Sequence, residues 1–143
     1  MNVQAATPST DKQARPIVPF LRLGDQPHLV AKKCETCGAV YLGSRVACSR
    51  CFTPGPFNEI RLSNRGSLWV YSIVYQSAPG IPTPYVAAIV DLPEGASVRC
   101  TLVDIAPDPR QLAFGMPVEM VTKKVREDKD GNDVIAFFYR PAK

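Results

Sequence analysis

Two Cys-x-x-Cys pairs, Cys-Glu-Thr-Cys at residues 34–37 and Cys-Ser-Arg-Cys at residues 48–51, stand ten residues apart in the chain. Each pair can place two thiolates on one tight turn, and two such turns that face each other form a cage of four sulfurs. Four thiolates in a tetrahedron suit Zn²⁺ and leave no open coordination position for water or substrate. We therefore predict a zinc ribbon with a structural ion, whose ligands are Cys34, Cys37, Cys48 and Cys51.

The four thiolates do not by themselves identify the metal. Iron in a rubredoxin-type site would use the same ligands, and the pairs could instead form disulfides or remain free buried thiols. Disulfides are disfavoured because residues 1–17 contain no apolar stretch of the kind that a signal peptide needs. No apolar run approaches the length of a membrane span. A fifth cysteine, Cys100, lies in an apolar strand pattern as a small buried hydrophobe, and this cysteine usage indicates a reducing, cytoplasmic setting.

The length of 143 residues suits a small metal module joined to one compact domain. A ribbon of about thirty residues cannot bury enough apolar surface to fold alone, so metal binding has to contribute to its folding free energy. The net charge of +4, from 17 basic and 13 acidic residues, is mild, and the basic residues are dispersed along the chain. Nucleic acid is therefore disfavoured as a partner.

We divide the chain into three parts. Residues 1–16, which are poor in large apolar side chains, are expected to form a flexible arm. Residues 17–58 are expected to hold a short helix after Pro19 and then the zinc ribbon. Residues 59–143 are expected to form the second domain.

The second domain has the pattern of strands separated by turns. β-Branched and aromatic residues recur between Pro, Gly and Asp, which predicts strands at residues 67–75, 85–92, 97–105, 117–126 and 134–139. Between the third and fourth of these, Asp108 can cap a short helical turn with Pro109 at its first position. Five strands with a helical insert at this point match the order of an OB-fold barrel, so the predicted fold class is mainly β.

Both faces of these strands carry apolar side chains. In residues 67–75, Leu68 and Val70 are expected on one face, with Trp69 and Tyr71 on the other. A closed barrel buries one face of each strand, and the sequence has no long amphipathic helix to cover the second face. The apolar side chains on the second face therefore indicate that the zinc module, another protein or a second copy of the chain covers this face.

No catalytic constellation stands out in the sequence. His28 is the only histidine, and no glycine-rich phosphate loop occurs. The acidic residues from Asp128 onward resemble the start of a calcium loop, but an EF-hand needs Gly at its sixth and Glu at its twelfth position. Asp133 and Tyr139 stand there instead. A closed four-thiolate zinc offers no Lewis-acid position, so the chain is not expected to be an enzyme on its own.

The order of several short motifs resembles a known family. After a proline-bounded segment and the two cysteine pairs come Gly-Ser-Leu-Trp-Val-Tyr-Ser at residues 66–72, Pro-Tyr-Val-Ala-Ala-Ile-Val-Asp-Leu at 84–92, Gly-Met-Pro-Val-Glu at 115–119 and Phe-Tyr-Arg-Pro at 138–141. In this order the motifs resemble the rubredoxin-like zinc-ribbon plus OB-fold family that is catalogued as a domain of unknown function. The resemblance covers roughly residues 17–141.

The resemblance implies an accessory role. Members of the family look like non-catalytic subunits bound to a thiolase-fold catalytic subunit, an acyltransferase or an acyl-CoA aldolase, and they share a coenzyme A site with it. By this resemblance the cofactors are structural Zn²⁺ and a coenzyme A ester, and the partner carries the catalytic residues. The alternative is a stand-alone module that binds acyl-CoA or single-stranded nucleic acid.

The expected contacts rest on the same resemblance and on side-chain chemistry. The residues expected to contact acyl-CoA are Lys32, Arg45, Arg65, Pro82 and Tyr85. The residues expected at the partner interface are Trp69, Tyr71, Tyr75, Phe137 and Tyr139.

Overall fold

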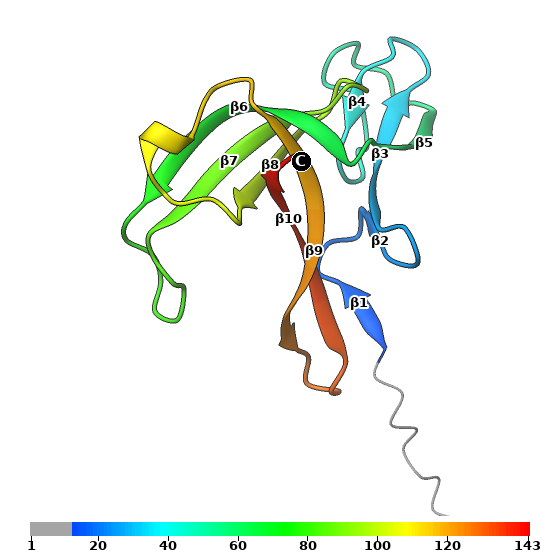
Figure 1. The fold of residues 1–143 in the computed structure, drawn as a ribbon. Coiled ribbons are helices and arrows are strands. Elements are labelled where there is room, and N and C mark those ends of the chain that lie inside the picture. Colours follow the sequence, from blue (N-terminus) through cyan, green and yellow to red (C-terminus); the bar gives the residue numbers. More distant parts are fainter. Residues whose placement is uncertain (1–12) are drawn as a thin grey trace, which may run out of the picture.

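Five strands of the chain close into a barrel (Figure 1). The computed structural model describes residues 13–143, and the barrel strands are β6 (Arg65–Val74), β7 (Tyr85–Asp91), β8 (Ser97–Leu102), β9 (Pro117–Glu127) and β10 (Asp133–Pro141). They pair in the order β10, β8, β7, β6, β9, and β9 pairs with β10 to complete the ring. β8 and β10 are parallel, and the other barrel pairs are antiparallel. The predicted OB-fold class is therefore confirmed.

Alternate residues of the barrel strands fill its interior. On β7, Val86, Ala88 and Val90 are buried, whereas the residues between them are partly exposed. Successive side chains of a strand point to opposite faces, so this alternation directs one face of β7 to the core. Val98 of β8 and Val118 of β9 belong to the same core.

β6 contains an irregularity that exposes a tryptophan. Leu68 pairs with Val90 and Val70 pairs with Ile89, so Trp69 is an extra residue without an opposite partner. Such a β-bulge interrupts the alternation of a strand. Trp69 and Val70 are consequently both exposed, at 54% and 38%. The expectation that Val70 shares the buried face of Leu68 is wrong, because the bulge shifts the alternation by one residue.

The ribbon is a second sheet built around one strand. β3 (His28–Cys34) pairs antiparallel with β2 (Leu21–Arg22), β4 (Val40–Tyr41) and β5 (Phe57–Arg61). In Figure 1 this sheet stands beside one end of the barrel. Leu21, Leu29 and Leu62 lie at its base and belong to the same buried cluster as the barrel residues. Ribbon and barrel therefore share a core at their junction.

The N-terminal segment differs from the prediction in two ways. Ala14–Pro16 forms β1, which pairs in parallel with Asp133 to Ile135 of β10 and so is not part of a flexible arm. Residues 1–12 of the predicted arm lie outside the described residues. The predicted helix after Pro19 is absent, because the short stretch there forms β2 and buries Leu21 completely. A helix of so few residues is marginal, and burial of the leucine favours the strand.

The N-terminal segment packs on β10. The Phe20 ring meets Phe137 edge-on with centroids 6.1 Å apart, and Phe137 meets Tyr139 at 6.4 Å. Tyr139 is 0% exposed and lies in the barrel core, and burial raises the pKa of its hydroxyl. The expectation that Tyr139 contacts a partner is therefore wrong, because no partner can reach its side chain.

A short 3-10 helix, Pro109–Gln111, lies between β8 and β9, where the sequence predicts a helical turn. The Asp108 carboxylate accepts a hydrogen bond from the Arg110 backbone N–H at 2.9 Å, and this capping confirms the prediction. Across residues 13–143 the structure contains no helix with the length and apolarity that crossing a membrane would require.

Gly66 of β6 has no room for a side chain. A Cβ there would lie 2.5 Å from the Asp91 carbonyl oxygen and 2.8 Å from side-chain atoms of Val90 and Leu92. We expect Gly66→Ala to lower the free energy of unfolding by about 2 kcal/mol, because β6 and β7 would have to separate. Urea denaturation measures this loss, with Ser72→Ala at an exposed position of the same strand as the control. Equal stability of the two variants would contradict the described packing.

Candidate metal centre and apolar cavity

The two cysteine pairs occupy turns of matching geometry, which we call the first and second knuckle. The Gly38 N–H donates to the Cys34 carbonyl at 2.8 Å, and the Phe52 N–H donates to the Cys48 carbonyl at the same distance. The first cysteine of each pair donates its own N–H to the carbonyl five residues later, again at 2.8 Å. Gly38 and Phe52 both have positive φ, at 79° and 63°. The chain thus builds the same turn twice.

The knuckles bring four sulfur atoms together. Cys34 Sγ lies 3.7 Å from Cys51 Sγ, Cys37 Sγ lies 3.5 Å from Cys48 Sγ, and all four lie within 4.8 Å of one another. Zn–S bonds of ~2.3 Å in a tetrahedron separate the sulfurs by about 3.8 Å, which is close to these distances. All four cysteines are free thiols. The donor set and its spacing could therefore hold a metal ion.

Hydrogen bonds at the cluster separate the pKa values of its thiols. The Tyr41 hydroxyl, 3.3 Å from Cys48 Sγ, is the main cause that lowers the pKa of Cys48 to about 6. The Cys37 backbone N–H is the main cause that lowers the pKa of Cys34. At Cys37 the hydrogen bond from the Ala39 backbone lowers the pKa, but burial and the neighbouring cysteines raise it to about 11. The cluster therefore retains protons at neutral pH that a bound cation would displace.

Tyr41 also connects the cluster to a basic side chain. Its hydroxyl lies 3.0 Å from Ser49 Oγ, and the Arg45 guanidinium stands 4.2 Å from the centroid of its ring. A cation above an aromatic face is held by the ring quadrupole. Arg45, expected to contact acyl-CoA, is thus positioned against the ribbon close to the second knuckle.

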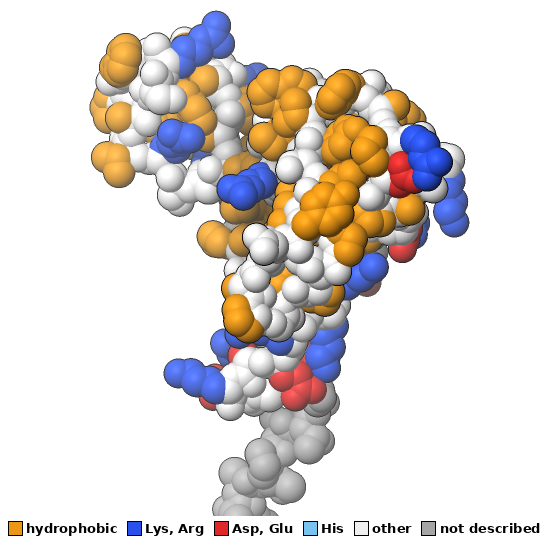
Figure 2. Space-filling model, turned by 90° about the vertical axis from the view of Figure 1, so that its left-hand side faces the viewer, with side chains coloured by type: hydrophobic (Ala, Val, Ile, Leu, Met, Phe, Trp, Pro, Cys, Tyr) orange, Lys and Arg blue, Asp and Glu red, His pale blue; other side chains and the backbone are white. Residues whose placement is uncertain are grey.

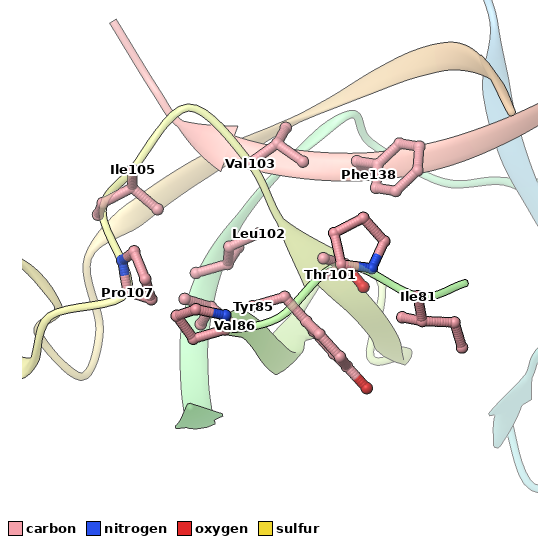
Figure 3. Close-up of a pocket in the computed structure, with 11 residues that line it drawn as sticks. Ile81, Tyr85, Val86, Thr101, Leu102, Val103, Ile105, Pro107 and Phe138 are labelled. Atoms are coloured by element: carbon pink, nitrogen blue, oxygen red, sulfur yellow. The ribbon is translucent and has the colours of Figure 1, made fainter. Parts of the chain in front are cut away.

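An apolar cavity of about 550 Å³ opens in the barrel beside the loop between β6 and β7 (Figure 3). Its walls come from that loop, β7, β8, the segment after β8, and β10. The lining residues are Ile81, Pro82, Pro84, Tyr85, Val86, Thr101, Leu102, Val103, Ile105, Pro107 and Phe138. None of them is charged, and Thr101 and Tyr85 supply the hydroxyl groups. A cavity of this size and character suits an apolar chemical group.

The residues predicted to contact acyl-CoA are divided among three places. Pro82 and Tyr85 line the apolar cavity. Lys32 and Arg45 line a recess of about 210 Å³ on the ribbon. Arg65 lines another recess, at the start of β6. The structure therefore brings together two pairs of these residues but not all five.

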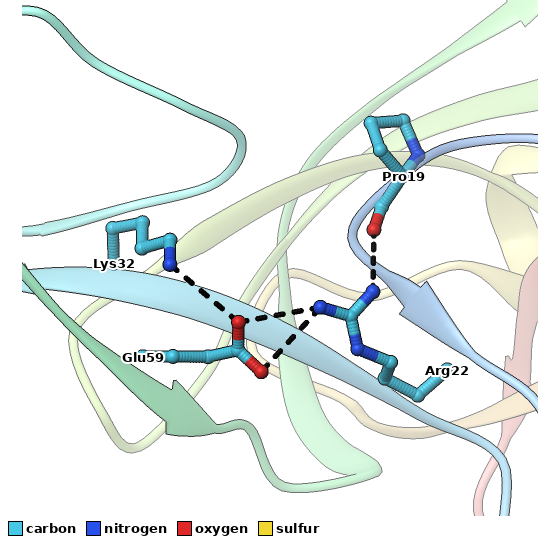
Figure 4. Close-up of polar contacts among 4 residues, drawn as sticks. All are labelled: Pro19, Arg22, Lys32 and Glu59. Atoms are coloured by element: carbon cyan, nitrogen blue, oxygen red, sulfur yellow. Dashed lines mark hydrogen bonds and ion pairs between the residues drawn. The ribbon is translucent and has the colours of Figure 1, made fainter.

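The charge of Lys32 is partly neutralised by an ion-pair cluster (Figure 4). Lys32 Nζ lies 3.5 Å from Glu59 Oε2, and Arg22 donates to both oxygens of the same carboxylate at 3.2 and 3.4 Å. Arg22 also donates to the Pro19 carbonyl at 2.7 Å. A phosphate that approached Lys32 would compete with Glu59 for this cation, so the sequence-based choice of Lys32 overlooked a partner on another strand.

Several aromatic residues remain at the barrel surface. Trp69 and Tyr75 are 54% and 68% exposed, whereas Tyr71 and Phe137 are partly buried against the core. The Tyr71 ring packs on Phe114 with centroids 5.5 Å apart, and Phe114 is 72% exposed. Figure 2 shows hydrophobic side chains exposed over the barrel. Phe114 was not among the residues predicted at an interface, although the sequence shows it as an isolated aromatic residue just before the fourth predicted strand.

Comparison with known proteins places these features in a family. The family model described as the ChsH2 C-terminal OB-fold domain matches residues 59–123. A DUF35 domain-containing scaffold protein of Methanocaldococcus jannaschii is 37% identical over 114 residues, which cover 78% of this chain and 79% of that protein. The benzoylsuccinyl-CoA thiolase subunit BbsA of Thauera aromatica is 28% identical over 117 residues, which cover 82% of this chain and 78% of BbsA.

A solved structure supports the same grouping. The structure named Ltp2-ChsH2(DUF35) aldolase superposes with a TM-score of 0.61 at 26% sequence identity, and the match covers 81% of this chain and 86% of that one. The family resemblance seen in the sequence motifs is therefore confirmed. These matches extend over the cysteine-bearing ribbon and the OB-fold barrel. The chain therefore belongs to the DUF35 family.

Proposed function

We propose that this chain is a non-catalytic accessory subunit of a thiolase-type acyl-CoA enzyme, whose partner subunit carries out the chemistry. The names of two similar proteins support this proposal, since BbsA is a thiolase subunit and the Ltp2-ChsH2(DUF35) pair an aldolase. Within this chain, the observation that carries it is the exposure of three large aromatic side chains of the barrel domain, Trp69, Tyr75 and Phe114. Large aromatic side chains of this kind are enriched at protein interfaces.

The environments of Cys100 and His28 are consistent with a partner that supplies the catalytic groups. Burial raises the pKa of the Cys100 thiol to about 12, so it stays protonated and is a poor nucleophile. His28, a residue of the ribbon strand β3, has its Nδ1 2.9 Å from the Gln26 carbonyl oxygen. Covalent catalysis needs a nucleophile within reach of its base. In this proposal both groups are supplied by the partner.

The four cysteines hold Zn²⁺ in this proposal. Zinc accepts four thiolates in a tetrahedron, and the sulfur separations of 3.5 and 3.7 Å suit it. A closed thiolate shell keeps the ion structural, and a reducing cytoplasm keeps the ligands from forming disulfides. When bound, the ion supplies cross-linking of the ribbon and takes no part in the reaction of the partner.

The apolar cavity receives the acyl group of a coenzyme A ester in this proposal. Its lining carries no charge, so it suits the hydrocarbon part of the ester and not the phosphates. The phosphates need cationic side chains nearby. Basic residues of the partner, or of this chain outside the cavity, would bind them through charge-assisted hydrogen bonds. A stand-alone acyl-CoA binding module would use the same cavity without a partner, and this is the second candidate.

Affinity purification distinguishes the two candidates. A tagged chain expressed in its native cell is expected to bring down a thiolase-sized protein in fixed stoichiometry, which mass spectrometry identifies. Trp69→Arg should lose this companion, because a charge replaces an exposed aromatic anchor, whereas Ser72→Arg at an exposed position of the same strand should keep it. A chain recovered alone that binds acyl-CoA without a companion would support the stand-alone module instead.

Substitution of one ligand tests the metal assignment. We expect Cys51→Ser to lose bound zinc and to unfold the ribbon, because little else is buried there. Elemental analysis of the purified protein measures the zinc, and amide hydrogen exchange locates the unfolded segment. Cys100→Ser is the control and should retain one zinc per chain. A Cys51→Ser variant with full zinc content and an unchanged melting temperature would refute the four-thiolate site.

Filling the cavity tests the acyl site. Val103→Trp places an indole in the space lined by Tyr85 and Phe138, and it should weaken acyl-CoA binding by the purified complex about tenfold. Isothermal titration calorimetry measures the affinity. Val125→Trp, at a 44% exposed position of β9, should bind like the unmodified chain. Equal affinities for the two variants would place the acyl group elsewhere.

A further inference from the structure

We propose that the second knuckle of the ribbon is a docking point for the catalytic partner, with Val46 and Phe52 as its apolar anchors. These side chains are 93% and 83% exposed, the highest values among the large hydrophobic residues of the described chain. Val46 precedes Cys48 by two residues, and Phe52 follows Cys51 directly. The inference rests on the proposed function and adds the chemistry of the partner surface, an apolar hollow edged by carboxylates.

Phe52 has a backbone conformation that glycine would adopt at a lower free-energy cost in the isolated chain. In the first knuckle the equivalent residue is Gly38, with the same hydrogen bond to the first cysteine of its pair. Phe52 has a φ of 63°, in the left-handed region that is unfavourable for a residue with a Cβ. Its ring is 83% exposed, so burial within the chain does not compensate for this conformation. A partner that buries the ring would compensate for the unfavourable backbone conformation.

The charges around the second knuckle identify the kind of surface that fits it. Between Thr36 and Asn58 the charged residues are Arg45 and Arg50, and no Asp or Glu occurs. A second copy of the chain would oppose arginines with arginines. An acidic rim on a different protein complements them and would accelerate association.

The backbone of Phe52 is also held in place before a partner arrives. The Phe52 N–H is tied to the Cys48 carbonyl at 2.8 Å, and the four sulfurs lock the same turn. An anchor that is already positioned loses little conformational freedom on binding. The cysteine cluster thereby contributes to recognition by fixing the backbone position from which the Phe52 side chain projects.

The test is the affinity of the chain for the catalytic subunit that co-purifies with it, measured by biolayer interferometry. Phe52→Gly should weaken binding by about tenfold or more, because it removes an anchor. The melting temperature of the isolated variant should not fall, since glycine suits a positive φ. Val46→Ser should weaken binding as well. Val125→Ser, at a 44% exposed site on β9, is the matched control and should bind like the unmodified chain.

Charge reversal gives a second measurement. Arg50→Glu should slow association and reduce its dependence on salt, because it removes attraction to the acidic rim. Unchanged affinity in Phe52→Gly would overturn the docking proposal and leave the accessory role standing. Equal losses in Phe52→Gly and Val125→Ser would also overturn it, because the effect would not be specific to the knuckle. An unmodified chain that binds no catalytic subunit would overturn both proposals.

Discussion

The convergence of four cysteine sulfurs within 4.8 Å is the constraint on which the ribbon depends. Between Lys32 and Arg61 the buried residues are Cys34 and Cys48 alone, and the remaining side chains are partly or fully exposed. Apolar burial is worth only about 25 cal/mol per Å², so a segment that buries so little gains little from it. Thiolates held this close repel one another unless a cation lies between them. We infer that metal binding provides the free energy that folds this segment and fixes both knuckles.

The barrel needs no such cross-link, because its strands close on themselves and enclose a continuous apolar core. The two parts meet at Leu21, Leu29 and Leu62, which belong to that core. Each part then offers a different surface. The barrel has the apolar cavity and the exposed aromatic side chains Trp69, Tyr75 and Phe114, and the ribbon has the exposed second knuckle. The proposed accessory role, in which the chain binds a partner and lines an acyl site, would use surfaces of both kinds.

Local chemistry made much of this structure predictable. Cysteine spacing identified the cluster because two short turns suffice to build it, and runs of β-branched and aromatic residues bounded by Pro, Gly and Asp located the five barrel strands. Features that depend on distant pairing could not be predicted in this way. The bulge at Trp69 exists only relative to β7, β1 forms only because β10 offers a free edge, and Glu59 neutralises Lys32 from a neighbouring strand. The cavity combines loop, strand and turn residues from Ile81 to Phe138, so no single motif indicated it.

The most direct test of this account is zinc K-edge X-ray absorption spectroscopy on the purified, unmodified chain. Four sulfur atoms at about 2.3 Å are expected in the first shell of the zinc ion, with no nitrogen or oxygen neighbour. This result would establish the closed thiolate cage on which the ribbon and the presentation of Phe52 depend. A shell that contained fewer sulfurs, or a chain that is fully folded without any metal, would contradict the central claim.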